Sequence, residues 1–162
     1  FHSSQALRSL RLKSRGSITV EGYERFEFRE LFGRRGEDDS DIGISTRLNY
    51  NHPMNNVVAP YLTQSIDKLR EALGNKLIGA VLYGSYARNE ADEGSDIDFL
   101  VVEKTVKDRV AEMVRLNRIL SPLRIPVDLL VVSEEMFDYW SSTPGSVYYN
   151  ALTEGKTIYE AA

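Results

Sequence analysis

The chain has 162 residues, of which 42% are hydrophobic and 27% charged, and its net charge is −4. These are ordinary values for one globular domain, and the acidic balance argues against general nucleic-acid binding. There is no cysteine, and both histidines, His2 and His52, lie in the first third. The main body therefore cannot hold a disulfide scaffold, a thiolate zinc site, a cysteine nucleophile or a histidine-centred triad. The absence of cysteine also fits a cytoplasmic location, and no run approaches the roughly 20 apolar residues of a membrane span.

The first third differs from the rest in charge and patterning. Residues 1–53 carry nine Lys and Arg against eight Asp and Glu, a net of +1, and the remainder carries −5. The weak periodicity of 1–53 predicts too little buried apolar surface to offset the entropy of ordering. We therefore expect residues 1–53 to be a disordered or non-native N-terminal extension, with Met54 as the candidate true start. The alternative is a small appended subdomain or a partner-binding arm.

Patterning is clear after Pro60. Hydrophobic periodicity and the Gly, Pro and Ser signals predict the elements in chain order. They are a helix over 60–73, a strand over 77–83, a short helix or loop over 86–93, a strand over 97–102, a helix over 106–119, a strand over 126–132, a helix capped by Ser133, a helix over 144–154 and an edge strand over 157–159. This order predicts an α/β sheet covered by helices on at least one face. The aromatic residues near the C-terminus are expected in the core, or alternatively at an interface: Tyr139, Trp140, Tyr148 and Tyr149.

Two aspartates open the second apolar strand. Asp96 and Asp98 flank Ile97, and side chains alternate along a strand, so both carboxylates should share one face, about 6–7 Å apart. A third acid, Asp128, stands within the third strand. Burying a carboxylate within an apolar strand costs free energy unless the carboxylate is paired with a cation or hydrogen-bonded. If the third strand lies beside the second, Asp128 converges on the same patch.

Three neighbouring carboxylates need a counter-ion. Two like charges 4 Å apart repel by roughly 4 kcal/mol at an effective dielectric of 20, a large share of a domain stability of about 5–15 kcal/mol. An all-oxygen ligand set favours Mg²⁺, or alternatively Mn²⁺, and two such ions serve phosphoryl transfer in many sites. Taken singly, Asp-Ile-Asp is also typical of a solvated strand edge or loop, and Asp128 of a satisfied acid at a strand end. Their combination on successive strands favours a nucleotide–metal site.

A Gly-Ser pair ends the first predicted strand. Gly84 allows the backbone to approach a ligand closely, and Ser85 adds a hydroxyl at the start of the expected helical turn. Backbone N–H groups at a helix start bind phosphate oxygens. One end of the site would therefore bind an anion and the other a metal, as a nucleoside triphosphate with Mg²⁺ requires.

These residues resemble the nucleotidyltransferase superfamily with the DNA polymerase β-like palm. The family pattern is a strand, Gly-Ser, about ten residues, Asp-x-Asp and a third acid on a later strand. Here it reads Gly84-Ser85, Asp96-Ile97-Asp98 and Asp128. The resemblance covers residues 54–162, the length of the minimal nucleotidyltransferases, and the stretch 149–159 is similar to their usual ending. It implies an α/β (α+β) fold in which helices pack on a small mixed sheet.

The resemblance also implies roles for single residues. Asp96 and Asp98 would bind two Mg²⁺ ions. Asp128 would bind one of them and help to deprotonate an attacking hydroxyl. These three aspartates are thus the expected catalytic and metal-binding residues.

The expected nucleotide contacts follow from the same resemblance. Gly84 and Ser85 would hold the triphosphate of ATP. Arg88 and Ser95 are implied as secondary contacts. Arg88 is equally typical of a surface arginine, and Ser95 of a cap or turn.

The implied reaction transfers AMP from ATP to a hydroxyl of a partner protein and releases pyrophosphate. Minimal nucleotidyltransferases often act beside HEPN-domain toxins as the antitoxin, so a HEPN-domain protein is the implied partner. Residues 54–162 contain no second domain to hold an acceptor, so a partner chain or a second copy would have to supply it. The alternatives are a small-molecule nucleotidyltransferase of the aminoglycoside-modifying kind, and a catalytically silent antitoxin that acts by binding.

Overall fold

The computed structural model describes residues 18–20, 23–25 and 53–161. Within the front segment, β1 (Ile18–Val20) and β2 (Tyr23–Arg25) pair as antiparallel strands. The other residues of 1–52 lie outside the described part of the chain. The expectation that residues 1–53 are a disordered or non-native extension therefore stays a prediction.

A four-stranded mixed sheet in the order β5-β4-β3-β6 forms the centre of the main body. β3 (Leu77–Tyr83) pairs antiparallel with β4 (Ile97–Glu103) and with β6 (Lys156–Glu160). β5 (Val127–Ser133) runs parallel to β4. The predicted mixed sheet is confirmed. The predicted bounds 77–83 of β3 and the predicted edge position of β6 are confirmed as well.

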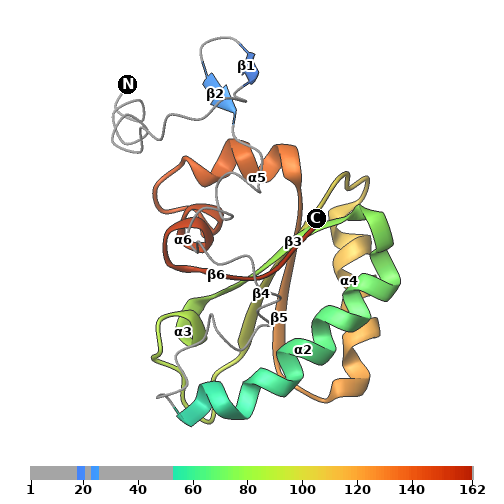
Figure 1. Cartoon of the computed structure of the whole chain (residues 1–162), viewed down its shortest axis with the longest axis vertical. Coiled ribbons are helices and arrows are strands. Elements are labelled where there is room, and N and C mark those ends of the chain that lie inside the picture. The colour runs from blue at the N-terminus through green and yellow to red at the C-terminus, as the bar shows by residue number, and fades with distance from the viewer. Residues whose placement is uncertain (1–17, 21–22, 26–52, 162) are drawn as a thin grey trace.

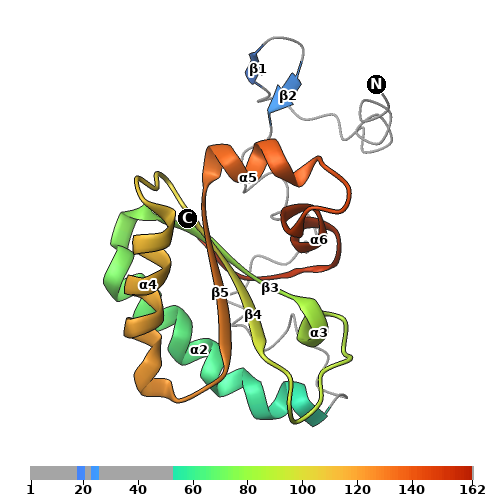
Figure 2. The ribbon, with the colours of Figure 1, turned by 180° about the vertical axis from the view of Figure 1, so that it is seen from behind.

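Helices cover both faces of this sheet, with α2 and α4 on one side and α5 and α6 on the other (Figures 1 and 2). The helical elements are α2 (Pro53–Leu73), η3 (Gly74–Lys76), α3 (Gly84–Ala87), α4 (Arg109–Leu120), η4 (Ser121–Leu123), α5 (Glu134–Ser141) and α6 (Val147–Glu154). No helix in this described part of the chain is both long enough and apolar enough to cross a membrane.

Strand β4 separates two apolar clusters. Phe99 and Val101 belong to the cluster that includes α2 and α4, whereas Leu100 and Val102 pack with Phe137 of α5. All four of these strand residues are fully buried. The continuous apolar pattern of β4 therefore reflects a strand that is buried on both faces.

Three helix starts were predicted wrongly. α4 begins at Arg109 rather than at residue 106, because Asp108 caps it. α2 begins at Pro53 rather than near Pro60, because proline is well suited to the first position of a helix and Pro60 is accommodated within it. α6 begins at Val147 rather than Pro144, because Ser146 caps it and its Oγ accepts a hydrogen bond from the Tyr149 N–H at 3.0 Å.

The prediction of a C-terminal aromatic core was wrong for Tyr139 and Trp140, whereas Tyr148 packs against the cluster around Phe137. Tyr139 is 67% exposed and Trp140 38% exposed, while Tyr148 and Tyr149 are half-buried. Phe137 and Ser141, one turn apart, form the buried face of α5, so Tyr139, two positions after Phe137, points outward, and Trp140 lies at the edge of that face.

Helix α4 begins at an aspartate cap. Asp108 Oδ1 accepts a hydrogen bond from the Ala111 N–H at 3.0 Å. Asp108→Ala is expected to lower the free energy of unfolding by about 1 kcal/mol, the usual cost of losing such a cap. Lys107→Ala, an exposed neighbour outside the cap, is the control. Urea midpoints that are equal for Asp108→Ala and Lys107→Ala would contradict the role of the cap.

Candidate functional site

Strand register brings two of the predicted aspartates together. Asp98 in β4 and Asp128 in β5 are direct partners in the parallel ladder, and neighbouring strands lie about 4.8 Å apart. Both side chains point to the same face of the sheet as Leu100, toward the side of α5 and α6. The prediction that Asp128 converges on Asp98 through adjacent strands is confirmed.

Asp96 lies just before the strand. The ladder of β4 begins at Ile97, whose N–H donates to Pro126 O at 2.8 Å, and Asp96 is exposed in the preceding loop. The predicted start of this strand at residue 97 is confirmed. Because Asp96 precedes the strand, the alternation that was expected to put both carboxylates on one face applies to Asp98 and not to Asp96. A turn formed by residues 92–95 occupies the chain up to that point, so Asp96 lies between the turn and the first paired residue of the strand.

The pKa of the half-buried Asp98 responds to the other charged groups of the site. Burial raises the pKa of its carboxyl, and the charges of Asp128 and then Asp96 raise it further, whereas Arg88 lowers it. All four groups are therefore close enough to interact. The carboxylates repel one another as the sequence predicted, and a bound cation would relieve that repulsion.

Gly84 fits against Asp98. Gly84 directly follows β3, starts α3 and has a φ of +70°. A Cβ at this position would clash with Oδ2 of Asp98 and lie 2.9 Å from its Cγ. Only glycine satisfies both the backbone conformation and this contact. The Gly-Ser turn therefore lies beside the acidic residues, as predicted.

Ser85 and Arg88 flank the same turn. Ser85 is half-buried in α3. Arg88 donates from Nε to Glu90 Oε2 at 2.8 Å and from Nη1 to Glu154 Oε2 at 3.5 Å. Arg88 is thus an exposed, ion-paired arginine that also lies within electrostatic reach of the site. Sequence reasoning missed Glu154 because it comes from α6, far along the chain.

Ser95 takes part in a turn. Its Oγ donates to Asp92 Oδ1 at 3.0 Å and accepts from the Asp92 N–H at 2.9 Å. The hydroxyl is thereby engaged within the loop that precedes Asp96. Its role in the turn is evident, and a nucleotide contact by Ser95 stays a prediction.

Tyr83 was not singled out from the sequence. It is the register partner of Asp98 across the β3–β4 ladder and is buried. Burial raises the pKa of its hydroxyl well above the ordinary value, and the charges of Asp98 and Asp128 raise it further. Its position directly before Gly84 could have indicated that Tyr83 lies near the site. An aromatic residue at the end of a strand, however, usually indicates a core position.

The donor set fits a hard divalent cation. Within residues 18–20, 23–25 and 53–161, no three His, Cys, Asp or Glu side chains are already gathered as metal ligands. Asp98 and Asp128 nevertheless supply paired carboxylates whose repulsion a cation relieves. Mg²⁺ commonly takes one or two carboxylates and completes its shell with water and substrate phosphates. This chemistry matches the residues present.

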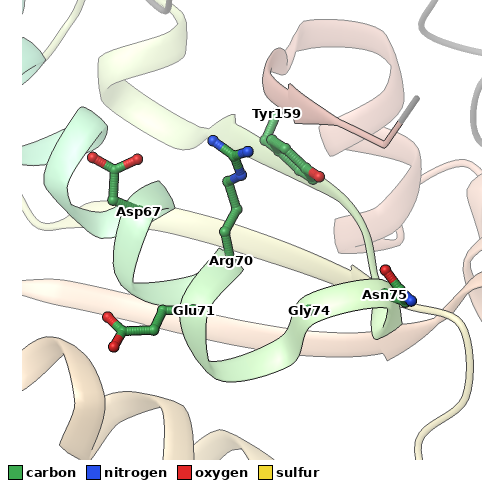
Figure 3. Close-up of a pocket in the computed structure, with 6 residues that line it drawn as sticks. All are labelled: Asp67, Arg70, Glu71, Gly74, Asn75 and Tyr159. Carbon is green, nitrogen blue, oxygen red and sulfur yellow. The ribbon is translucent and has the colours of Figure 1, made fainter.

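A separate hollow lies at the end of α2 beside β6. Figure 3 shows the Arg70 side chain extending toward the Tyr159 ring, with the guanidinium carbon 5.6 Å from the ring centre. The hollow measures about 390 Å³ and is lined by Asp67, Arg70, Glu71, Gly74, Asn75 and Tyr159. None of the predicted site residues contributes to it, so the candidate site is the acidic strand end.

Comparison with known proteins matches this chain to a family and to several relatives. The model of the nucleotidyltransferase domain family matches residues 65–154. A Methanocaldococcus jannaschii protein named "Putative protein adenylyltransferase MJ0604" is 29% identical over 98 residues, which cover 60% of this chain and 94% of that protein.

Solved structures agree with the fold. A structure described as "a putative nucleotidyltransferase from Sulfolobus solfataricus" has a TM-score of 0.51 and 18% identity, covering 76% of this chain and 93% of that one. A complex of tri-AMPylated Shewanella oneidensis HEPN toxin with MNT antitoxin has a TM-score of 0.42 and 24% identity, covering 62% and 71%. The first likeness concerns the fold alone, and the second is too distant to carry an argument. Because the family model matches more than half of the chain and spans the site, this protein belongs to the nucleotidyltransferase domain family and is an enzyme of that class.

Proposed function

We propose that this nucleotidyltransferase transfers AMP from ATP, in the presence of Mg²⁺, to a hydroxyl of a partner protein. The observation that carries the proposal is the direct register of Asp98 and Asp128 beside Gly84. It puts a carboxylate pair next to a backbone turn that phosphates can approach. A nucleoside triphosphate with its cation needs both features.

Each residue has a distinct task in this proposal. Gly84 and Ser85 bind phosphate oxygens through backbone N–H groups and a hydroxyl at the start of α3. Asp98 and Asp128 hold the cation, and Asp96 joins them from the exposed loop. When bound, Mg²⁺ neutralises charge on the triphosphate and polarises the α-phosphate. Arg88 provides a cation beside the phosphates.

The chemical step is a substitution at the α-phosphorus. The acceptor hydroxyl oxygen forms a bond to that phosphorus while the α–β phosphoanhydride bond breaks, and pyrophosphate leaves. The hydroxyl proton passes to Asp128, which acts as the general base. Alignment of the hydroxyl with the leaving group supplies much of the rate through positioning.

A protein acceptor is the choice that the relatives favour. The M. jannaschii relative, most of whose length this chain covers, is named a protein adenylyltransferase. The sequence resemblance to antitoxins makes a HEPN-domain toxin the proposed partner, with a second copy of this chain as the other acceptor to be tested.

The test is transfer of label from α-phosphate-labelled ATP with Mg²⁺ in extract of the source cell, resolved by size. We expect label on one small protein, and loss of that label when Asp96→Asn/Asp98→Asn replaces the wild type. Glu93→Gln, an exposed acid in the same loop, is the control and should keep the signal. Label only on small molecules would contradict the protein acceptor, and label that persists in the double variant would contradict the assigned site.

A further inference from the structure

Glu103 is a buried acid at the end of β4 opposite to Asp98. It is the last residue of the strand and only 2% exposed. Its side chain lies on the same face as Phe99 and Val101, which is the face covered by α2 and α4. A carboxylate is seldom buried this completely unless it is paired or protonated.

The neighbour of Glu103 is a second carboxylate. Oε1 of Glu103 has no hydrogen-bond donor within the described residues, and the carboxylate of Glu112 in α4 lies within hydrogen-bonding reach. Glu112 is itself held by Arg115, whose Nε donates to Glu112 Oε2 at 3.0 Å. Two ionised carboxylates contain acceptors but no donor, so a single proton would satisfy both of them.

Few other charges surround the pair. Besides Glu112, the charged groups that act on Glu103 are Arg115 of α4 and Lys76 of η3. Its register partners, Leu77 in β3 and Ser133 in β5, are uncharged. Burial first, and then the charge of Glu112, raise the pKa of Glu103 to about 7 against the opposing effect of the two cations.

We propose that Glu103 and Glu112 share one proton and form a pH-dependent clamp between β4 and α4. With the proton in place, a carboxyl-to-carboxylate hydrogen bond joins the strand to the helix. When the proton leaves, the buried charge of Glu103 faces the like charge of the partly exposed Glu112, and the contact weakens. The clamp involves neither the catalytic aspartates nor a bound metal, so it is independent of the proposed reaction.

The direction of the pH effect follows from proton binding. Unfolded Glu titrates near its ordinary value of 4.5, whereas folded Glu103 titrates near 7, so between these values the folded state binds more protons. Stability is therefore lost as pH rises through this window. Because the folded state binds one proton more than the unfolded state, each unit of rising pH in this window raises the unfolding equilibrium constant roughly tenfold.

The test is urea unfolding of the full chain at pH 5, 6, 7 and 8, comparing wild type with Glu103→Gln. The amide keeps the shape and donates to Glu112 without titrating. We expect the wild-type unfolding constant to rise, relative to that of Glu103→Gln, by up to about tenfold per unit between pH 5 and 7. Glu135→Gln, an exposed acid on α5, should follow the wild type. Parallel curves for wild type and Glu103→Gln would overturn the clamp.

A second measurement keeps the proposal testable if Glu103→Gln does not fold. The side-chain carboxyl of Glu103 in the wild type is titrated by carbon-13 NMR. A midpoint near pH 7 supports the shared proton. A midpoint near that of an exposed glutamate overturns it.

Discussion

Asp98→Asn is expected to lower nucleotidyl transfer at least about 100-fold while leaving the fold intact. The amide removes one of the two register-paired carboxylates that would hold the cation. It also removes the like-charge repulsion within the site, so the free energy of unfolding should not fall. Transfer is measured with labelled ATP and Mg²⁺, and stability by urea unfolding of the same protein.

Asp67→Asn is the matched control for Asp98→Asn, because Asp67 is an exposed aspartate in the separate hollow of α2. It should transfer at the wild-type rate. Asp128→Asn, in contrast, should lose activity to a similar extent as Asp98→Asn. A fully active Asp98→Asn protein would show that the acidic strand end is not the catalytic site.

Gly84→Ala is expected to abolish transfer and to destabilise the domain by about 1–3 kcal/mol. Two causes act together. Alanine at a φ of +70° is strained, and its Cβ would clash with the carboxylate of Asp98. Asp98 must rotate away or the turn must move, and either change disrupts the site. Transfer and thermal unfolding are measured side by side.

Gly74→Ala separates these two causes. Gly74 also has a positive φ, +52°, but a Cβ there meets nothing within 4 Å. It should therefore share the backbone strain of Gly84→Ala and keep full transfer. If both variants lost activity equally, or if Gly84→Ala stayed active, the contact between Gly84 and Asp98 would have no catalytic importance.

Local sequence patterns predicted where the strands lie, but they predicted which strands are neighbours only conditionally. The apolar run over Leu77–Tyr83 ends at a glycine, and the structure has the same bounds. The approach of Asp128 to Asp98 was predicted only on the condition that their strands are neighbours, since register depends on pairing between distant segments. The parallel ladder of β4 and β5 meets that condition.

Failures arose where long-range packing decides the outcome. The strand begins at Ile97 as predicted, but Asp96 precedes it, so strand alternation does not put Asp96 on the face of Asp98 as expected. Tyr139 and Trp140 have core-type side chains, yet Phe137 takes the single inward-facing position of that turn in α5. Nothing in the sequence pattern indicated that Glu103 is buried, because an acid at the end of an apolar strand is normally solvated.

Binding of ATP to the purified full chain by titration calorimetry, with and without Mg²⁺, tests the central claim most directly because it needs no acceptor. ATP binding is expected to depend on Mg²⁺ in the wild type, to be strongly weakened in Asp98→Asn, and to be unchanged in Asp67→Asn. ATP binding that is equally strong without Mg²⁺, or equally strong in Asp98→Asn, would contradict a nucleotide–metal site at Asp98, Asp128 and Gly84.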